Sequence, residues 1–287
     1  MSIVLENASY SFRLNDGCLV PALCDVTLEI NDGEFVGIMG HTGCGKTTLL
    51  QLMTGLLTPT SGRVLLDGSD INAKDYDRNE LRKNIGLVFQ FPEYQLFEST
   101  VEKDVAFALK NSALSQGEVK ERVKWALETM EFSFEAIRTQ APLSLSGGEK
   151  RRVAIAGALV TKPRFLIFDE PIAGLDPQSR QSFLQTVTSL NSKGTAIIMI
   201  SHNTDALGEC AKRLLVIDGG SLVIDGGMKD VFSDSKRLTA LHLNAGTPRA
   251  IGDMLSSYGV TVPQTVTSYA ELLCVLKLRL AGNGCDD

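Results

Sequence analysis

The sequence lacks any apolar run long enough to cross a membrane. Its apolar stretches, such as Phe165–Phe168 and Thr195–Ile200, are only a few residues long, whereas a transmembrane helix needs about 20. Residues 1–6 also lack the basic segment, the long apolar segment and the small-residue cleavage site of a secretory signal. We therefore expect a chain that spans no membrane and stays in the cytoplasm.

Patterned cysteines and an excess of basic residues are missing too. The six cysteines are scattered, without a C-x-x-C pair or histidines at zinc-finger spacing, which favours free thiols. Lysine and arginine number 28 against 34 aspartates and glutamates, so there is no basic footprint for nucleic acid and we expect no nucleic-acid partner. The 287 residues, 44% hydrophobic and 22% charged, suit one large globular domain with a small appendage.

The apolar pattern alternates between strand and helix. Helical periodicity, with apolar residues every three or four positions, covers Val101–Met130, and a second helix is expected at Gly148–Val160. Because strands and helices alternate along the chain, we expect an α/β fold with helices covering a sheet. The short runs expected to form strands are Ile3–Glu6, Val26–Ile30, Phe35–Met39, Arg63–Asp67, Ile85–Phe89, Phe165–Asp169, Ala196–Ile200 and Leu214–Asp218.

The strongest motif is a phosphate-binding loop of the form G-x-x-x-x-G-K-T, which follows a predicted strand and precedes a helix. Its glycines let backbone N–H groups point at phosphates, Lys46 supplies positive charge, and Thr47 supplies a hydroxyl for Mg²⁺. The loop thus predicts ATP and Mg²⁺ as ligands. The residues expected to hold the nucleotide here are Gly40, His41, Thr42, Gly43, Cys44, Gly45, Lys46, Thr47 and Thr48.

A second motif places two carboxylates at the end of the predicted strand Phe165–Phe168. Asp169 is suited to hold Mg²⁺, and Glu170 to orient or deprotonate the attacking water. An apolar run that ends in Asp-Glu is weak evidence alone, because such residues also cap turns. Together with the phosphate-binding loop, it indicates nucleotide hydrolysis.

The third motif is Leu145-Ser146-Gly147-Gly148-Glu149, which opens the helix ending near Val160. A capped helix start would explain an isolated S-G-G-E, but unpaired N–H groups at a helix start also hold anions. In combination with the other two motifs, these residues resemble the signature motif of ABC-type ATPases.

That resemblance implies roles for further residues. Gln90 matches the Q-loop, Asp176 the D-loop and His202 the switch histidine, while Phe12 matches the aromatic residue that stacks on adenine, with Tyr10 as second choice. The catalytic residues implied are Glu170, His202 and Lys46; the metal ligands are Thr47, Gln90 and Asp169. The nucleotide-binding residues implied outside the loop are Phe12, Gln90, Ser146, Gly147, Gly148 and Asp176.

The resemblance also implies the domain organisation and an ATPase partner. We expect an ABC ATP-binding domain over residues 1–228, with a mixed core sheet, an antiparallel β part and a helical subdomain at about 95–160. A C-terminal appendage, a candidate for dimerisation, would follow at 229–287. In this family two ATP molecules lie between two ATPase subunits, so the partner would be a second copy or a different ATPase. Ser146 and Gly148 would then complete the γ-phosphate cage of the partner.

Within the family, the segment Phe89–Phe97 resembles the ATPases of energy-coupling factor transporters, most like the second of the paired ATPases. This implies an integral transmembrane coupling protein, a small substrate-binding membrane protein, and uptake of a vitamin or a transition-metal ion. The chain would work as a peripheral protein on the cytoplasmic face of the cell membrane. Two departures, Glu149 for the usual Gln and Ile172 for the usual Thr, leave the turnover rate open.

Three other functions share parts of this pattern. A repair ATPase would need a long insert between Gln90 and Ser146, where only 55 residues lie, and a translation ATPase would carry two cassettes. The ATPase of another ABC importer, for an amino acid, a peptide or another small solute, shares the same chemistry, and the segment Phe91–Phe97 discriminates against it. A degenerate subunit that binds ATP without hydrolysis is disfavoured by Glu170 and His202.

Two expectations concern single features. Cys44 lies two residues before Lys46 at a helix start, so its thiol should ionise and be alkylated readily, unless it is packed away from solvent. The appendage has more apolar residues than an exposed tail would carry, so it should pack on its own domain or on the partner ATPase. The residues concerned are Leu255, Val260, Val262, Leu272, Leu273 and Leu276.

Overall fold

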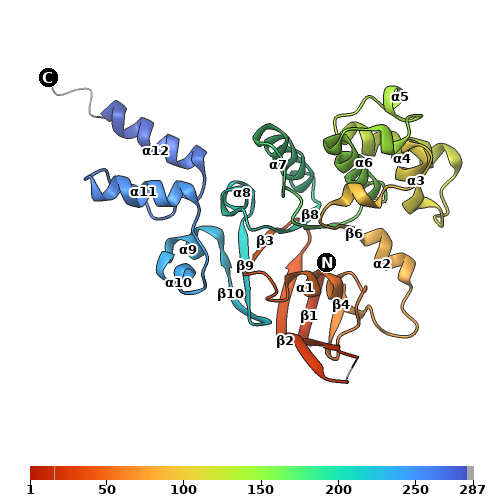
Figure 1. Ribbon diagram of the computed structural model, residues 1–287, viewed down its shortest axis with the longest axis horizontal. Helices are drawn as coiled ribbons and strands as arrows, with labels where there is room; N and C mark the ends of the chain where they lie inside the picture. Colours follow the sequence, from red (N-terminus) through yellow and green to blue (C-terminus); the bar gives the residue numbers. More distant parts are fainter. Residues whose placement is uncertain (16, 283–287) are drawn as a thin grey trace.

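The computed structural model describes residues 1–15 and 17–282 and contains two sheets (Figure 1). The core sheet has six strands. Five of them run parallel, and β10 at one edge pairs antiparallel with β9. In sheet order the strands are β10 (Ser221–Gly227), β9 (Arg213–Asp218), β3 (Phe35–Met39), β8 (Ala196–Ile200), β7 (Phe165–Asp169) and β6 (Ile85–Val88).

A second, antiparallel sheet packs beside the core sheet. Its long strands extend well beyond the short apolar runs that the sequence predicts, with register irregularities between β1 and β2. The mixed core sheet and the antiparallel part are therefore both present as expected. The strands in sheet order are β2 (Leu19–Asn31), β1 (Ser2–Arg13), β4 (Ser61–Leu66) and β5 (Ser69–Asp70).

Helices cover the core sheet and form a lobe at one end. The lobe contains α3 to α6, and the last two helices lie at the opposite end of the molecule (Figure 1). The α-helices are α1 (Lys46–Met53), α2 (Arg78–Asn84), α3 (Val101–Ala106), α4 (Gln116–Thr129), α5 (Phe134–Ile137), α6 (Gly147–Leu159), α7 (Pro177–Ser192), α8 (Thr204–Cys210), α9 (Met228–Ser233), α10 (Ser235–Ala240), α11 (Thr247–Ser257) and α12 (Tyr269–Gly282). The 3-10 turns are η1 (Pro92–Gln95), η2 (Phe107–Leu109) and η3 (Pro142–Ser144).

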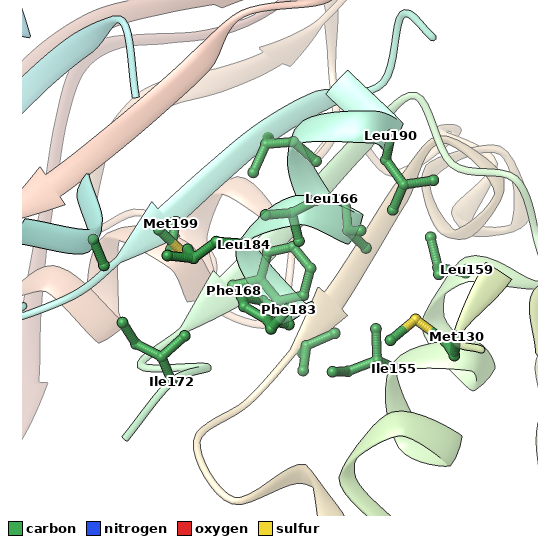
Figure 2. Packing of buried hydrophobic residues seen from close by; sticks show 14 of the residues in the cluster. Met130, Ile155, Leu159, Leu166, Phe168, Ile172, Phe183, Leu184, Leu190 and Met199 are labelled. Carbon is green, nitrogen blue, oxygen red and sulfur yellow. The ribbon is translucent and has the colours of Figure 1, made fainter. Parts of the chain in front are cut away.

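The central strands are continuous apolar runs because both of their faces are covered. Every residue of β3, β7 and β8 is buried, as expected for parallel strands between two layers. On one face, Phe168 of β7 meets Phe183 of α7 edge-on, with ring centroids 5.3 Å apart (Figure 2). This packing fixes the carboxyl ends of β7 and β8, where the predicted catalytic residues follow.

The C-terminal region divides its apolar residues between two clusters. Phe232, Leu238 and Leu243 belong to the main core, so α9 and α10 pack on the core-sheet domain. A separate small cluster contains Val262, Val266 and Leu272, with Leu255 and Leu276 against it, whereas Leu273 is 55% exposed. The domain boundary near residue 229 stays a prediction, and residues 283–287 of the expected appendage lie outside the described residues.

None of the described helices has both the length and the apolar character that crossing a bilayer requires.

Candidate functional site

A cleft of 840 Å³ opens where the phosphate-binding loop meets the ends of β7 and β8. Side chains from segments far apart in the sequence line it, because the parallel strands end at the same edge of the sheet. Most of the predicted site residues are therefore brought together. Those that line the cleft are Phe12, Thr42, Gly43, Gly45, Lys46, Thr47, Thr48, Gln90, Asp169, Glu170 and His202.

The phosphate-binding loop requires glycine at two of its positions. Gly40 has φ 153° and Gly45 has φ 108°, and a Cβ atom at either would lie 2.3 Å or 2.5 Å from a backbone carbonyl oxygen. The loop curls around the Lys46 ammonium, which donates to the carbonyl oxygens of Gly40 and His41 at 2.8 Å each. A compact, positively charged cradle with glycine turns can hold the phosphates of a nucleotide.

Thr47 and Asp169 meet in the cleft. The Thr47 hydroxyl donates to Asp169 Oδ2 at 2.9 Å. Among the described residues no three His, Cys, Asp or Glu side chains cluster as a metal cage. Mg²⁺, however, commonly uses one or two protein oxygens, with the rest from phosphate and water. This hydroxyl and carboxylate therefore fit Mg²⁺ that arrives with a nucleotide, and Gln90 lines the same cleft.

Glu170 and His202 lie side by side in the same cleft. The His202 backbone N–H donates to Glu170 Oε2 at 3.3 Å, and His202 Nε2 lies 3.4 Å from Glu170 Oε1. Burial raises the pKa of Glu170, and the neighbouring charge of Asp169 adds to the rise. Burial also lowers the pKa of His202, with the Lys46 charge acting in the same direction. The imidazole of His202 thus faces the side chain of Glu170, whose Oε1 accepts no hydrogen bond from the described residues.

Phe12 is the aromatic residue of the cleft. It is 42% exposed and contacts Tyr10 edge-on, with centroids 5.0 Å apart. Tyr10 instead packs against the core. The accessible ring of Phe12 can therefore stack on a flat base, and Tyr10 is the poorer candidate.

The signature residues do not reach this cleft. Ser146 and Gly148 line a different cavity, of 320 Å³, between α6 and α7. Ser146 caps α6 in a capping box with Glu149, its hydroxyl donating to Glu149 Oε2 at 2.6 Å. Asp176 caps α7 and accepts from the Gln178 backbone N–H at 3.0 Å. The described chain alone therefore does not bring Ser146, Gly147, Gly148 and Asp176 around the Lys46 cleft.

The expectation of a readily ionised Cys44 is wrong. Its side chain is 2% exposed, and burial raises the pKa of the thiol although Lys46 Nζ, 3.8 Å from Sγ, opposes the rise. The side chain belongs to the core cluster that contains Ile217 of β9, and the Gly220 N–H donates to the Cys44 carbonyl at 3.1 Å. Desolvation outweighs the nearby positive charge here.

Sequence reasoning missed Arg180. It lies in the first turn of α7 and lines the cleft with His202, and its buried Nε–H has no hydrogen-bond acceptor among the described residues. An arginine near the start of a helix has no distinguishing pattern, so nothing in the sequence separated it from an ordinary surface charge.

Comparison with known proteins agrees with this geometry. The family model described as ABC transporter matches residues 23–173. This chain belongs to the ABC transporter ATPase family. Its relatives include the energy-coupling factor transporter ATP-binding protein EcfA2 of Symbiobacterium thermophilum, 42% identical over 282 residues that cover 98% of both chains. The EcfA2 protein of Clostridium tetani is 41% identical over 93% of both chains.

Solved structures of ABC ATPases share the fold. The cbiO1 structure from Clostridium perfringens, part of the ABC transporter complex cbiONQ, has a TM-score of 0.72 and 35% identity, covering 88% of this chain and 98% of that one. The dimeric ABC transporter cassette MJ0796 has a TM-score of 0.69 and 31% identity, covering 78% and 98%. The predicted fold, ATPase activity and energy-coupling factor type are confirmed, and another ABC importer is not favoured.

Proposed function

We propose that this chain binds ATP with Mg²⁺ between itself and a second ATPase subunit and drives uptake of a vitamin or transition-metal ion through membrane partners. The observation that carries the proposal is the separation of the two half-sites. Lys46 and Glu170 line one cavity and Ser146 and Gly148 another, so a complete nucleotide cage needs a second subunit. The related cassette MJ0796, whose dimer has been solved bound to ADP and phosphate, supports this arrangement.

Each residue has a chemical task in the cleft. The loop N–H groups and Lys46 bind the phosphates, and Phe12 stacks on the base. Thr47 and Asp169, with Gln90, hold Mg²⁺, which when bound neutralises phosphate charge. Glu170, whose Oε1 has no hydrogen-bond donor in the described chain, orients the attacking water and accepts its proton. His202 supplies its backbone N–H to the other carboxylate oxygen and keeps Glu170 in place.

The departure at Glu149 is compatible with this mechanism. Glu149 accepts from both the backbone N–H and the hydroxyl of Ser146, at 2.9 and 2.6 Å, so the helix start that presents the signature is intact. Ile172 is 4% exposed and packs in the main core. Neither substitution removes a residue proposed to bind phosphate or metal.

Complementation tests the composite site. Lys46→Ala destroys the phosphate-binding half and Ser146→Arg the signature half, so each variant alone is expected to be inactive. Mixed together, they can form one intact site from the two undamaged halves, and ATPase activity should return. If Ser146→Arg chains alone retain full turnover, the composite site is wrong. If the partner is a different ATPase, mixing the two variants should restore nothing, and each variant paired with that subunit should keep one of the two composite sites.

The membrane partners are tested by isolating the tagged chain from native membranes in mild detergent. We expect a second ATPase, an integral coupling protein and a small substrate-binding membrane protein to copurify, and the last of these identifies the cargo. Recovery of the chain only from the soluble fraction would contradict the proposed peripheral location on the cytoplasmic face.

A further inference from the structure

Arg151 is a buried cation that the ATPase site does not account for. It lies in the second turn of α6 and its side chain is 7% exposed. Its guanidinium donates to both carboxylate oxygens of Glu93, at 3.1 Å each, and to the carbonyl oxygen of Ala173 at 2.8 Å. A longer bond of 3.4 Å reaches the Pro171 carbonyl. One side chain of the signature helix thus binds two separate segments.

Those two segments are the ones that follow Gln90 and Glu170. Glu93 belongs to η1, which begins directly after Phe91, and Pro171 and Ala173 directly follow Glu170. The Ala173 N–H also donates to the Glu170 carbonyl at 3.2 Å. The guanidinium therefore closes the turn whose first residue is the proposed base.

Both segments start from an unusual backbone conformation. Phe91 has φ 54° and Glu170 has φ 49°, and each immediately precedes a proline. A residue with a Cβ atom seldom adopts this left-handed region, and such a conformation persists only where surrounding contacts hold it. The bidentate pair with Glu93 and the two carbonyl bonds are contacts of that kind.

We propose that Arg151 is a positioning residue, which fixes the Glu170 carboxylate relative to the loop after Gln90. Glu93 orients the guanidinium, and the guanidinium holds the turn after Glu170. Loss of Arg151 or Glu93 leaves nucleotide binding at the Lys46 loop intact but lets the carboxylate move from the water it must deprotonate. This inference rests on the proposed role of Glu170 as the base.

The test compares full-length Arg151→Met, Glu93→Gln and the double variant in Mg-ATP hydrolysis, with nucleotide affinity measured separately. We expect Arg151→Met to lower kcat about tenfold or more, since small displacements of a reacting group are costly, and to change the nucleotide Kd by less than about twofold. Glu93→Gln, which keeps the side-chain shape, should lower kcat in the same direction. Because the pair acts as a unit, the double variant should be no slower than Arg151→Met.

The control is Arg138→Met, which removes an arginine that pairs with Glu102 and Glu135 in the same lobe, both at 2.9 Å, but touches neither segment. Its kcat should equal the wild-type value. Any of three results would overturn the proposal. The double variant could lose kcat by the product of the two single losses, both single variants could keep kcat within twofold of wild type, or Arg138→Met could lose as much kcat as Arg151→Met. If Arg151→Met does not fold, Glu93→Gln alone carries the test.

Glu170→Gln, measured alongside, separates the two levels of inference. Full turnover by Glu170→Gln would show that Glu170 is not the base, and the proposal for Arg151 would fail with it. If Glu170→Gln is inactive while the Arg151 and Glu93 variants are fully active, Glu170 stays the proposed base and only the positioning role of Arg151 is excluded.

Discussion

Glu170 and His202 meet because they follow two adjacent parallel strands. Asp169 of β7 pairs with Ile200 of β8, so the two strands end at the same level of the sheet. The residues that follow them are therefore neighbours, and His202 Nε2 lies 3.4 Å from Glu170 Oε1. Strand register, set by fully buried apolar residues, thus determines the distance between base and histidine. The catalytic geometry is a product of the core.

We expect Glu170→Gln to bind ATP but hydrolyse it at least about a hundredfold more slowly, because the amide keeps the shape and cannot accept the proton. The ATP-bound pair of subunits should then accumulate, visible by size-exclusion chromatography with and without ATP. Glu209→Gln is the matched control, since burial also raises the pKa of Glu209 but its side chain does not line the cleft. Wild-type phosphate release by Glu170→Gln would exclude it as the base.

As the pH is lowered, the rate of ATP hydrolysis should fall at a higher pH than it would if the base were a carboxylate with an ordinary pKa. Burial raises the pKa of Glu170 above the usual 4.5. Only the deprotonated form accepts the proton of water, so activity is present above the raised pKa and is lost as the pH falls through it. Burial raises the pKa of Asp169 too, but an acid limb due to that residue should move with Mg²⁺ concentration. A limb at or below pH 4.5, in protein still folded by circular dichroism, would contradict the prediction.

How well the sequence predicts each element depends on whether local residues decide it. The strands β3, β7 and β8 match the expectation residue for residue, because each is an apolar run buried on both faces. Strand β1 runs to Arg13 rather than Glu6, since pairing with β2 extends it through residues with little apolar character. Long-range pairing of this kind leaves no local pattern.

The site shows the same division. Motifs identified the loop and the carboxylates of the Lys46 cleft, since their spacing reflects what phosphate and metal require, but not Arg180. Cys44 is buried in the cluster that contains Ile217, far along the chain, and the role proposed for Arg151 depends on Glu93, which is 58 positions away. Contacts between distant segments decide both, so the residues next to Cys44 and Arg151 gave no signal.

Maleimide should label Cys44 at least about tenfold more slowly than Cys24 or Cys274. Both comparison thiols are exposed, whereas Cys44 is buried with a raised pKa, and only the accessible thiolate reacts. Mass spectrometry of labelled peptides over time gives the three rates. Inhibition by the reagent should be the same in Cys44→Ser as in wild type; a resistant Cys44→Ser protein would show that this thiol is accessible after all.

Gly208→Ala should detach the small C-terminal cluster from the ATPase core. A Cβ atom at Gly208 would lie 2.2 Å from the Thr267 carbonyl oxygen, and the Thr267 hydroxyl donates to the Gly208 carbonyl at 3.2 Å. Overpacking of this kind costs about 1–3 kcal/mol. We expect a lower Tm and faster proteolysis between α10 and α11.

Gly117→Ala is the matched control for that substitution, because a methyl group at this position of α4 would have no atom within 4 Å apart from its chain neighbours and the adjacent helix backbone. It should leave Tm and the proteolytic pattern unchanged or slightly improved, since alanine favours helix over glycine. Equal protease resistance in Gly208→Ala and Gly117→Ala would mean that the contact with Thr267 does not hold the two parts together.

The distance between the two half-sites also has a kinetic consequence. Ser146 lines the cavity beside α7 and not the Lys46 cleft. The proposed active species is therefore a pair of chains and not the single chain. In a preparation of this chain alone, turnover per molecule would fall on dilution and the initial rate would rise with the square of protein concentration until pairing is complete. A specific activity given without the protein concentration would then be an average over inactive single chains and active pairs.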